Sequence, residues 1–177
     1  MRIRYKFFMA FIVIIAITIP VPVYILTRQI EQQRRAIIKE GEIFAKQIAH
    51  TVLNMLLLNS GNISQTSIDA YEYIRSLEYL FYDGFDSLQV ILVSPNPKYS
   101  GILLVDIPKT KLLSSVSNSM LQQLLSQPKV ISNKNGKISL LEFTAKATLA
   151  NNTIMCLSHL VFNESVKLKP VYQSYFL

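Results

Sequence analysis

Three side chains combine hydrogen-bonding chemistry with positions that a folded domain would partly enclose. His159 interrupts the apolar run 155–161, and strand alternation predicts that it shares a face with apolar neighbours. A polar group on such a face needs a partner, because burying it unsatisfied is costly. Arg75 and Tyr79 lie four residues apart on a predicted helix, so their side chains are neighbours. We expect the three to bind an unidentified small anionic or polar molecule, with Arg75 and Tyr79 closing over it.

The alternative interpretation gives these residues structural roles only. His159 then bonds a backbone carbonyl, and Arg75 pairs with Glu72 or Glu78 in solvent. The sequence leaves both interpretations open.

Other chemistry is hard to assemble from this sequence. Its two histidines, His50 and His159, lie far apart, with no cysteine or carboxylate at metal-ligand spacing. The sequence has no Gly-x-Ser-x-Gly motif and no phosphate-binding loop. Its single cysteine, Cys156, excludes an internal disulfide and lies in an apolar run, which favours a buried thiol over a nucleophile. We expect no enzymatic activity, no metal and no cofactor.

The net charge of +7 is scattered along the chain. No dense run of lysine and arginine with interleaved aromatic residues occurs, so we expect no nucleic-acid partner. A basic surface near anionic membrane lipid is the simpler interpretation.

Residues 7–26 indicate where in the cell the protein is located, because they are apolar and carry no charge. A helix of this length covers about 30 Å, the thickness of the hydrocarbon core of a bilayer. The basic residues Arg2, Arg4 and Lys6 precede it, as in a targeting signal. Residues 20–29 lack the small side chains of a cleavage site, which favours an uncleaved anchor over a cleaved signal peptide. The charges on the two flanks do not decide the orientation.

Residues 28–58 read as one long helix leaving the membrane, with Gly41 as its weak point. Ile30, Ile37 and Phe44 recur every seven residues, which predicts a parallel homodimer along this stalk. The alternative is a monomer whose helix curves over its own domain.

The rest of the chain alternates between helical and strand patterns, which predicts an α/β (α+β) domain. A pattern that resembles a capping box, Thr66 to Asp69, predicts the start of the second helix, with Gly84 as a plausible stop. Strand 153–162 is apolar on both faces, which predicts a central position in the sheet. The other predicted elements are strands 88–93, 102–107, 130–131 and 138–148 and a helix over 109–127.

This order of elements resembles the PAS-like extracytoplasmic sensor domains called Cache, found on bacterial chemoreceptors, sensor kinases and membrane adenylate cyclases. The residues that carry the resemblance lie in a first helix punctuated by small residues, 42–57, and in the last two strands, Leu141-Glu-Phe-Thr-Ala145 and Leu157-Ser-His-Leu-Val-Phe-Asn-Glu164. It implies a five-stranded antiparallel sheet with helices, a small ligand between one sheet face and the elements over it, and a periplasmic domain on a single-pass inner-membrane anchor. The turn of the first hairpin, Pro-Asn-Pro-Lys-Tyr, departs from the Asp and Gly usual in such domains.

Such receptors continue through a second membrane helix into an output domain, whereas this sequence ends seven residues after Pro170. We therefore expect the truncated or split sensor half of an adenylate cyclase-type receptor, with any effector on a separate chain. The alternatives are a membrane-anchored structural or assembly component of the envelope and, if the signal is cleaved, a secreted binding protein. The expected divisions are a cytoplasmic tail 1–6, an anchor 7–27, a stalk helix 28–58, a sensor domain 59–165 and a C-terminal tail 166–177.

Overall fold

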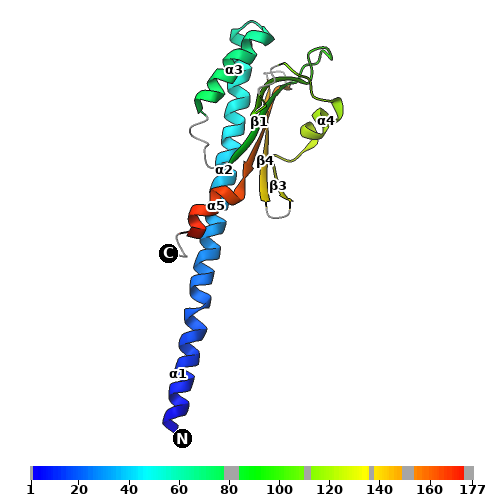
Figure 1. The fold of residues 1–177 in the computed structure, drawn as a ribbon. Coiled ribbons are helices and arrows are strands. Elements are labelled where there is room, and N and C mark those ends of the chain that lie inside the picture. Colours follow the sequence, from blue (N-terminus) through cyan, green and yellow to red (C-terminus); the bar gives the residue numbers. More distant parts are fainter. Residues whose placement is uncertain (1, 78–83, 110–112, 136–137, 149–153, 174–177) are drawn as a thin grey trace. The chain divides into compact units, whose positions relative to one another are not determined.

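The computed structural model describes residues 2–77, 84–109, 113–135, 138–148 and 154–173 (Figure 1). The chain divides into two compact units, one formed by Met1–Ala36 with Leu168–Leu177 and the other by Ile37–Lys167.

The N-terminal residues are helical, with one interruption. Helix α1 (Arg2–Thr18) is followed by Ile19 and then by α2 (Pro20–Leu58). Pro20 and Pro22 have no backbone N–H to donate, which explains the interruption of the helical hydrogen bonds here. Among the described residues, only the helical stretch Ile3–Leu58 is long and apolar enough to cross a membrane, and its most apolar window has a mean hydropathy of 2.6 and is not buried.

The larger unit is built on a five-stranded antiparallel sheet with the strand order β2-β1-β5-β4-β3. A long helix followed by this sheet and its helices confirms the expected α+β fold class. The strand that is apolar on both faces lies at the centre of the sheet, as predicted. The strands are β1 (Phe85–Leu92), β2 (Ile102–Ile107), β3 (Val130–Asn135), β4 (Ile138–Thr148) and β5 (Ile154–Asn163).

One face of the sheet packs against α2 and α3 (Ile63–Leu77), as Figure 1 shows. Two buried serines join the helices to the sheet. Ser158 Oγ donates to the carbonyl oxygen of Ala45 at 2.6 Å, and Ser67 Oγ donates to that of Leu104 at 2.6 Å. Apolar residues of α2 and α3 fill the space around these bonds and form the main core with alternate strand residues. These core residues include Ala45, Ile48, Val52, Leu56, Ala70, Ile74, Leu88, Val90, Phe143 and Leu160.

The opposite face of the sheet carries α4 (Asn118–Ser126) (Figure 1). Leu121 and Leu124 of this helix form a second, smaller core with strand residues Ile91, Leu103 and Leu157. Residues of β1, β2 and β5 thus contribute to both cores, because successive side chains of a strand point to opposite faces, apart from the bulge between Val90 and Ile91.

The predicted start of the second helix was wrong. The helix begins at Ile63, and the side chain of Asn62 accepts a hydrogen bond from the backbone N–H of Gln65, as an N-cap does. Thr66 lies inside the helix and is buried, with its hydroxyl donating to the carbonyl of Asn62. Asp69 accepts bonds from Asn59 and Gln65 instead of capping the helix. The predicted stop near Gly84 depends on residues 78–83, which lie outside the described residues.

The helix predicted over 109–127 was too long. α4 begins at Asn118, with Ser117 as its N-cap. The chain before it lies along β2, because Leu103 and the segment at Leu113 and Ser114 exchange backbone hydrogen bonds. Leu113 has φ 62°, which a helix does not allow. The apolar residues of this segment thus follow the sheet edge and not a helical stripe.

Two shorter stretches complete the fold. β3 continues beyond the strand predicted over 130–131 and ends at Asn135. Helix α5 (Glu164–Gln173) follows β5 and includes part of the predicted C-terminal tail. Its first residue, Glu164, is buried and accepts a hydrogen bond from Ser139 Oγ.

Candidate functional site

A row of polar side chains crosses the face of the sheet that carries α4. It consists of Asp106, Gln89, His159, Thr144 and Glu142, and is called the polar row below. Gln89 lies opposite Asp106 on β2 and opposite His159 on β5, and His159 lies opposite Thr144 on β4. Their chain neighbours belong to the core under α2, so strand alternation places the row on the other face.

The members of the polar row contact each other in pairs. Gln89 Nε2 donates to Asp106 Oδ1 at 3.2 Å, and His159 Nε2 lies 3.4 Å from Glu142 Oε2. Asp106 is only 6% exposed, and the side chains of His159 and Glu142 are 13% and 20% exposed. Whether the imidazole donates to Glu142 depends on its tautomer and protonation. The row is therefore largely enclosed yet still reaches solvent near its histidine.

The composition of the row fits recognition of a polar molecule. It offers two carboxylates, an imidazole, an amide and a hydroxyl on an otherwise apolar sheet, so a ligand could exchange several hydrogen bonds with it. No group of three or more His, Cys, Asp or Glu suited to a metal ion occurs in the described part of the chain. Cys156 faces the core under α2, and burial raises the pKa of its thiol to about 12.

The structure does not bring together Arg75 and His159, two of the three residues expected to share a site. Arg75 is exposed on α3, and α3 packs on the sheet face opposite the polar row. Tyr79 lies outside the described residues. His159 lies on the α4 face, and its partner is a side chain, Glu142, and not the backbone carbonyl of the alternative interpretation. A ligand-binding role for each of the three residues remains a prediction.

Sequence reasoning missed most of the polar row. The alternation of Leu141, Phe143 and Ala145 with Glu142, Thr144 and Lys146 indicated a polar face on β4. Gln89 and Asp106 are single polar residues in apolar strands, which is a weak signal by itself. Only the register between strands, which the pattern of a single strand does not reveal, places them in one line with His159.

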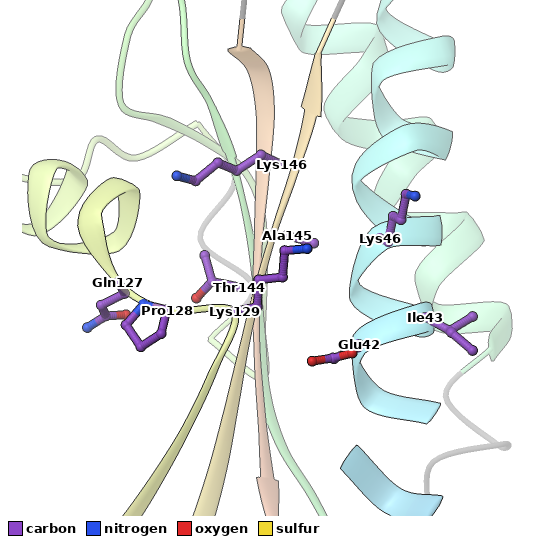
Figure 2. A pocket seen from close by; sticks show the side chains of 9 residues that line it. All are labelled: Glu42, Ile43, Lys46, Gln127, Pro128, Lys129, Thr144, Ala145 and Lys146. Atoms are coloured by element: carbon purple, nitrogen blue, oxygen red, sulfur yellow. The ribbon is translucent and has the colours of Figure 1, made fainter. Parts of the chain in front are cut away.

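A second feature is a cavity of about 520 Å³ at the open edge of β4 (Figure 2). All of its lining residues belong to the larger unit. They are Glu42, Ile43, Lys46, Gln127, Pro128, Lys129, Thr144, Ala145 and Lys146. The volume lies within the range of small-ligand sites, about 300–1,000 Å³.

Comparisons with known proteins give likenesses of structure only. No family model and no curated protein sequence matches the chain. The structure is similar to a crystal structure of the periplasmic domain of Vibrio cholerae LuxQ, with a TM-score of 0.48, 12% identity and coverage of 84% of this chain. A selenomethionine structure of the same domain gives a TM-score of 0.47, 11% identity and the same coverage. The match spans 66% of the LuxQ domain, slightly less than two thirds of its length.

Proposed function

We propose that this chain is a membrane-anchored sensor module of the PAS-like Cache type, with its sheet domain in the periplasm and its N-terminal helix in the inner membrane. It binds a small polar molecule at the polar row and carries no catalytic activity of its own. A separate effector chain produces the output signal. The sequence resemblance suggests that this effector is of the adenylate cyclase type.

The observation that carries this proposal is the polar row. Two carboxylates, an imidazole and an amide close together are not expected on a sheet face that only packs a core, since each group costs desolvation free energy when covered. Asp106 is buried and His159 nearly so, yet both keep polar contacts. A site held on strands is also rigid, so a bound molecule meets preorganised groups.

The proposal also includes a homodimer along the stalk. Its contact face on α2 differs from the face predicted from the sequence, which contains Ile30, Ile37 and Phe44. Ile37 and Phe44 pack against the core of their own domain. On another face of α2, the apolar residues Ile43 and Leu57 are exposed, with His50 midway between them at seven-residue spacing. Packing of that face against a second copy would link two sensor domains.

Ligand-dependent stabilisation tests the sensor assignment. The full chain in detergent micelles is melted with separate small carboxylates, amino acids, amines and hydroxy acids. A ligand present at about 100 times its Kd stabilises the folded state by about 2.7 kcal/mol, which raises Tm measurably. We expect at least one of these molecules to raise Tm of the wild type and of the control Lys98→Ala. His159→Leu and Gln89→Leu should fold but lose that rise.

Two outcomes would contradict the proposal. If none of the molecules raises Tm of the wild type, the polar row is no ligand site. If His159→Leu lowers Tm by several degrees and any ligand-induced rise persists, His159 is a structural hydrogen-bonding residue, and the ligand binds elsewhere.

A further inference from the structure

The sheet has an open edge where β4 continues beyond β3. β3 pairs with β4 from Asn135 opposite Ile138 to Val130 opposite Phe143. One more backbone bond follows, from Thr144 N–H to the carbonyl oxygen of Lys129 at 2.9 Å. Among the residues that the structure describes, positions 145–148 of the strand pair only with β5. The C-terminal end of β4 therefore has no neighbouring strand on its outer side among the described residues.

The geometry of an antiparallel ladder defines which groups point outward there. Backbone groups of alternate residues face the same neighbour, and Thr144 N–H faces outward. The N–H and C=O groups of Lys146 therefore face outward too, whereas Thr148 lies beyond a register shift in the pairing with β5. The side chain of Lys146 does not cover them, because its ammonium extends to α4 and donates to the carbonyl of Leu125 (Figure 2).

The cavity described above lies over this bare edge. Figure 2 shows that the carboxylate of Glu42 and the ammonium of Lys129 point into the space between the sheet and α2. Neither Lys46 nor Lys129 forms an ion pair within the residues that the structure describes. Gln127 also lines the cavity and has an unsatisfied acceptor. Its Oε1 is the only buried side-chain oxygen or nitrogen without a hydrogen-bond partner in the described part of the chain.

We propose that the open edge of β4 binds an extended, acidic peptide segment of a partner protein as an added strand. Backbone groups of the segment pair with the outward N–H and C=O of Lys146, as in other cases of strand addition. Acidic side chains of the segment meet Lys46 and Lys129, which outnumber Glu42 on the cavity wall. A donor of the segment meets Gln127 Oε1. This interaction does not depend on a ligand at the polar row.

A second copy of the chain is a poor occupant of the same edge. Two-fold antiparallel pairing of residues 144–148 with themselves would set Lys146 directly opposite its copy. Like charges directly opposite each other destabilise a strand pair. Lysine on an edge is a common protection against such self-pairing. An acidic partner strand avoids this repulsion.

The test measures binding of a defined peptide to the full chain in detergent micelles. The probe is a fluorescein-labelled hexapeptide of alternating glutamate and valine. Its fluorescence anisotropy is followed as the protein is added up to about 1 mM, so that a Kd as weak as about 1 mM is detected. The first control is the same peptide with methyl groups on alternate backbone nitrogens, which cannot donate to the edge. Two further variants form a matched pair. Lys129→Glu reverses a charge at the cavity, and Lys98→Glu reverses a charge far from it, on the 93–101 turn.

Lys146→Pro and Lys146→Met separate the edge from the side chain. Proline removes the outward N–H of β4, and proline is tolerated on edges whose N–H faces solvent. Methionine removes the contact with Leu125 but keeps the N–H. We expect saturable binding of the unmodified peptide to the wild type, Lys98→Glu and Lys146→Met. Binding should weaken about tenfold or more in Lys129→Glu, because the charge is reversed at the cavity, and be lost with Lys146→Pro.

Three results would overturn the proposal. They are no saturable binding to the wild type, equal binding of the methylated peptide, and equal weakening by Lys98→Glu and Lys129→Glu. If Lys146→Pro fails to fold, the methylated peptide and the pair of glutamate variants still decide the matter.

Discussion

The ring of Phe143 occupies the space where a side chain on residue 41 would begin. A Cβ placed on Gly41 would lie 2.5 Å from Cζ of Phe143, closer than such contacts occur in proteins. Phe143 is fully buried, and its ring also packs edge-on against Phe162 at 5.8 Å between centroids. Gly41 therefore lets α2 approach the sheet at the point where β4 places its largest side chain.

The first prediction is that Gly41→Ala destabilises the sheet domain. Helix propensity alone would favour alanine by about 1 kcal/mol. Steric conflict with Phe143 should outweigh this, because overpacking a filled core costs about 1–3 kcal/mol. Denaturant unfolding of the full chain in micelles, followed by circular dichroism, measures the net loss.

The control for this prediction is the double variant Gly41→Ala with Phe143→Leu. A smaller side chain at residue 143 makes room for the new methyl group, so the two changes should be less harmful together than their sum. A stability gain in Gly41→Ala would mean that α2 shifts freely on the sheet, contrary to the contact described.

Much of the fold follows from local sequence patterns. β2 and β4 have the predicted bounds, because alternating β-branched and apolar residues end at clear breaks such as Pro108. Gly41 shows the limit of this reasoning. From the sequence alone it was a weak point in a helix, whereas its actual role depends on Phe143, about a hundred residues away.

The candidate site was predicted less well than the fold, for a physical reason. The proximity of Gln89, His159 and Asp106 is a product of strand order and register, and neither is local. Arg75 and His159 each lay on a correctly predicted element. The two residues nevertheless lie apart, because α3 covers one face of the sheet and His159 lies on the other.

The second prediction concerns the corrected start of α4. The hydroxyl of Ser117 accepts a bond from the backbone N–H of Met120 at 3.3 Å. Ser117→Ala should therefore lower stability by about 1 kcal/mol, the usual cost of losing an N-cap, whereas Ser117→Asp should keep it. Hydrogen exchange should quicken in residues 120–126 of the alanine variant. Faster exchange at residues 113–117 instead would place the helix start earlier.

The third prediction is that Cys156 is inert in the folded chain and costs stability at alkaline pH. Burial raises the pKa of its thiol from 9.0 to about 12. A raised pKa stabilises the folded state below pH 9, and that contribution is lost as pH rises from 9 towards 12, by up to about 1.4 kcal/mol per unit. The unfolding free energy should therefore fall more steeply above pH 9 in the wild type than in Cys156→Ala.

Thiol labelling provides the matching control. Gln122→Cys places a second thiol on the exposed side of α4. A disulfide reagent at pH 8 should modify this thiol quickly and Cys156 only after denaturation. Equal rates for the two thiols in the folded chain would contradict the burial of Cys156.

The fourth prediction is that the chain fractionates with membranes, retains its N-terminus and exposes its sheet domain to the periplasm. Lys98 is exposed on the turn between β1 and β2. An amine reagent that does not cross the inner membrane should modify Lys98 in cells whose outer membrane has been permeabilised. Labelling of Lys98 only after complete lysis would reverse the orientation. An N-terminal sequence that begins near residue 25 would show a cleaved signal.

The last prediction is that two chains meet along the exposed face of α2 in the membrane. His50 lies on this face, between the exposed apolar residues Ile43 and Leu57, one heptad on either side. Parallel helices with residues at heptad spacing bring equivalent positions of the two copies together. In a Cys156→Ala background, His50→Cys should therefore form a disulfide-linked dimer in membranes under mild oxidation, while Gln122→Cys on α4 should not. Ile37→Cys should also fail, because Ile37 packs on the core of its own domain. Equal crosslinking at residues 50 and 122 would indicate random collision of monomers. Crosslinking at residue 37 alone would instead support the dimer interface predicted from the sequence, through Ile30, Ile37 and Phe44.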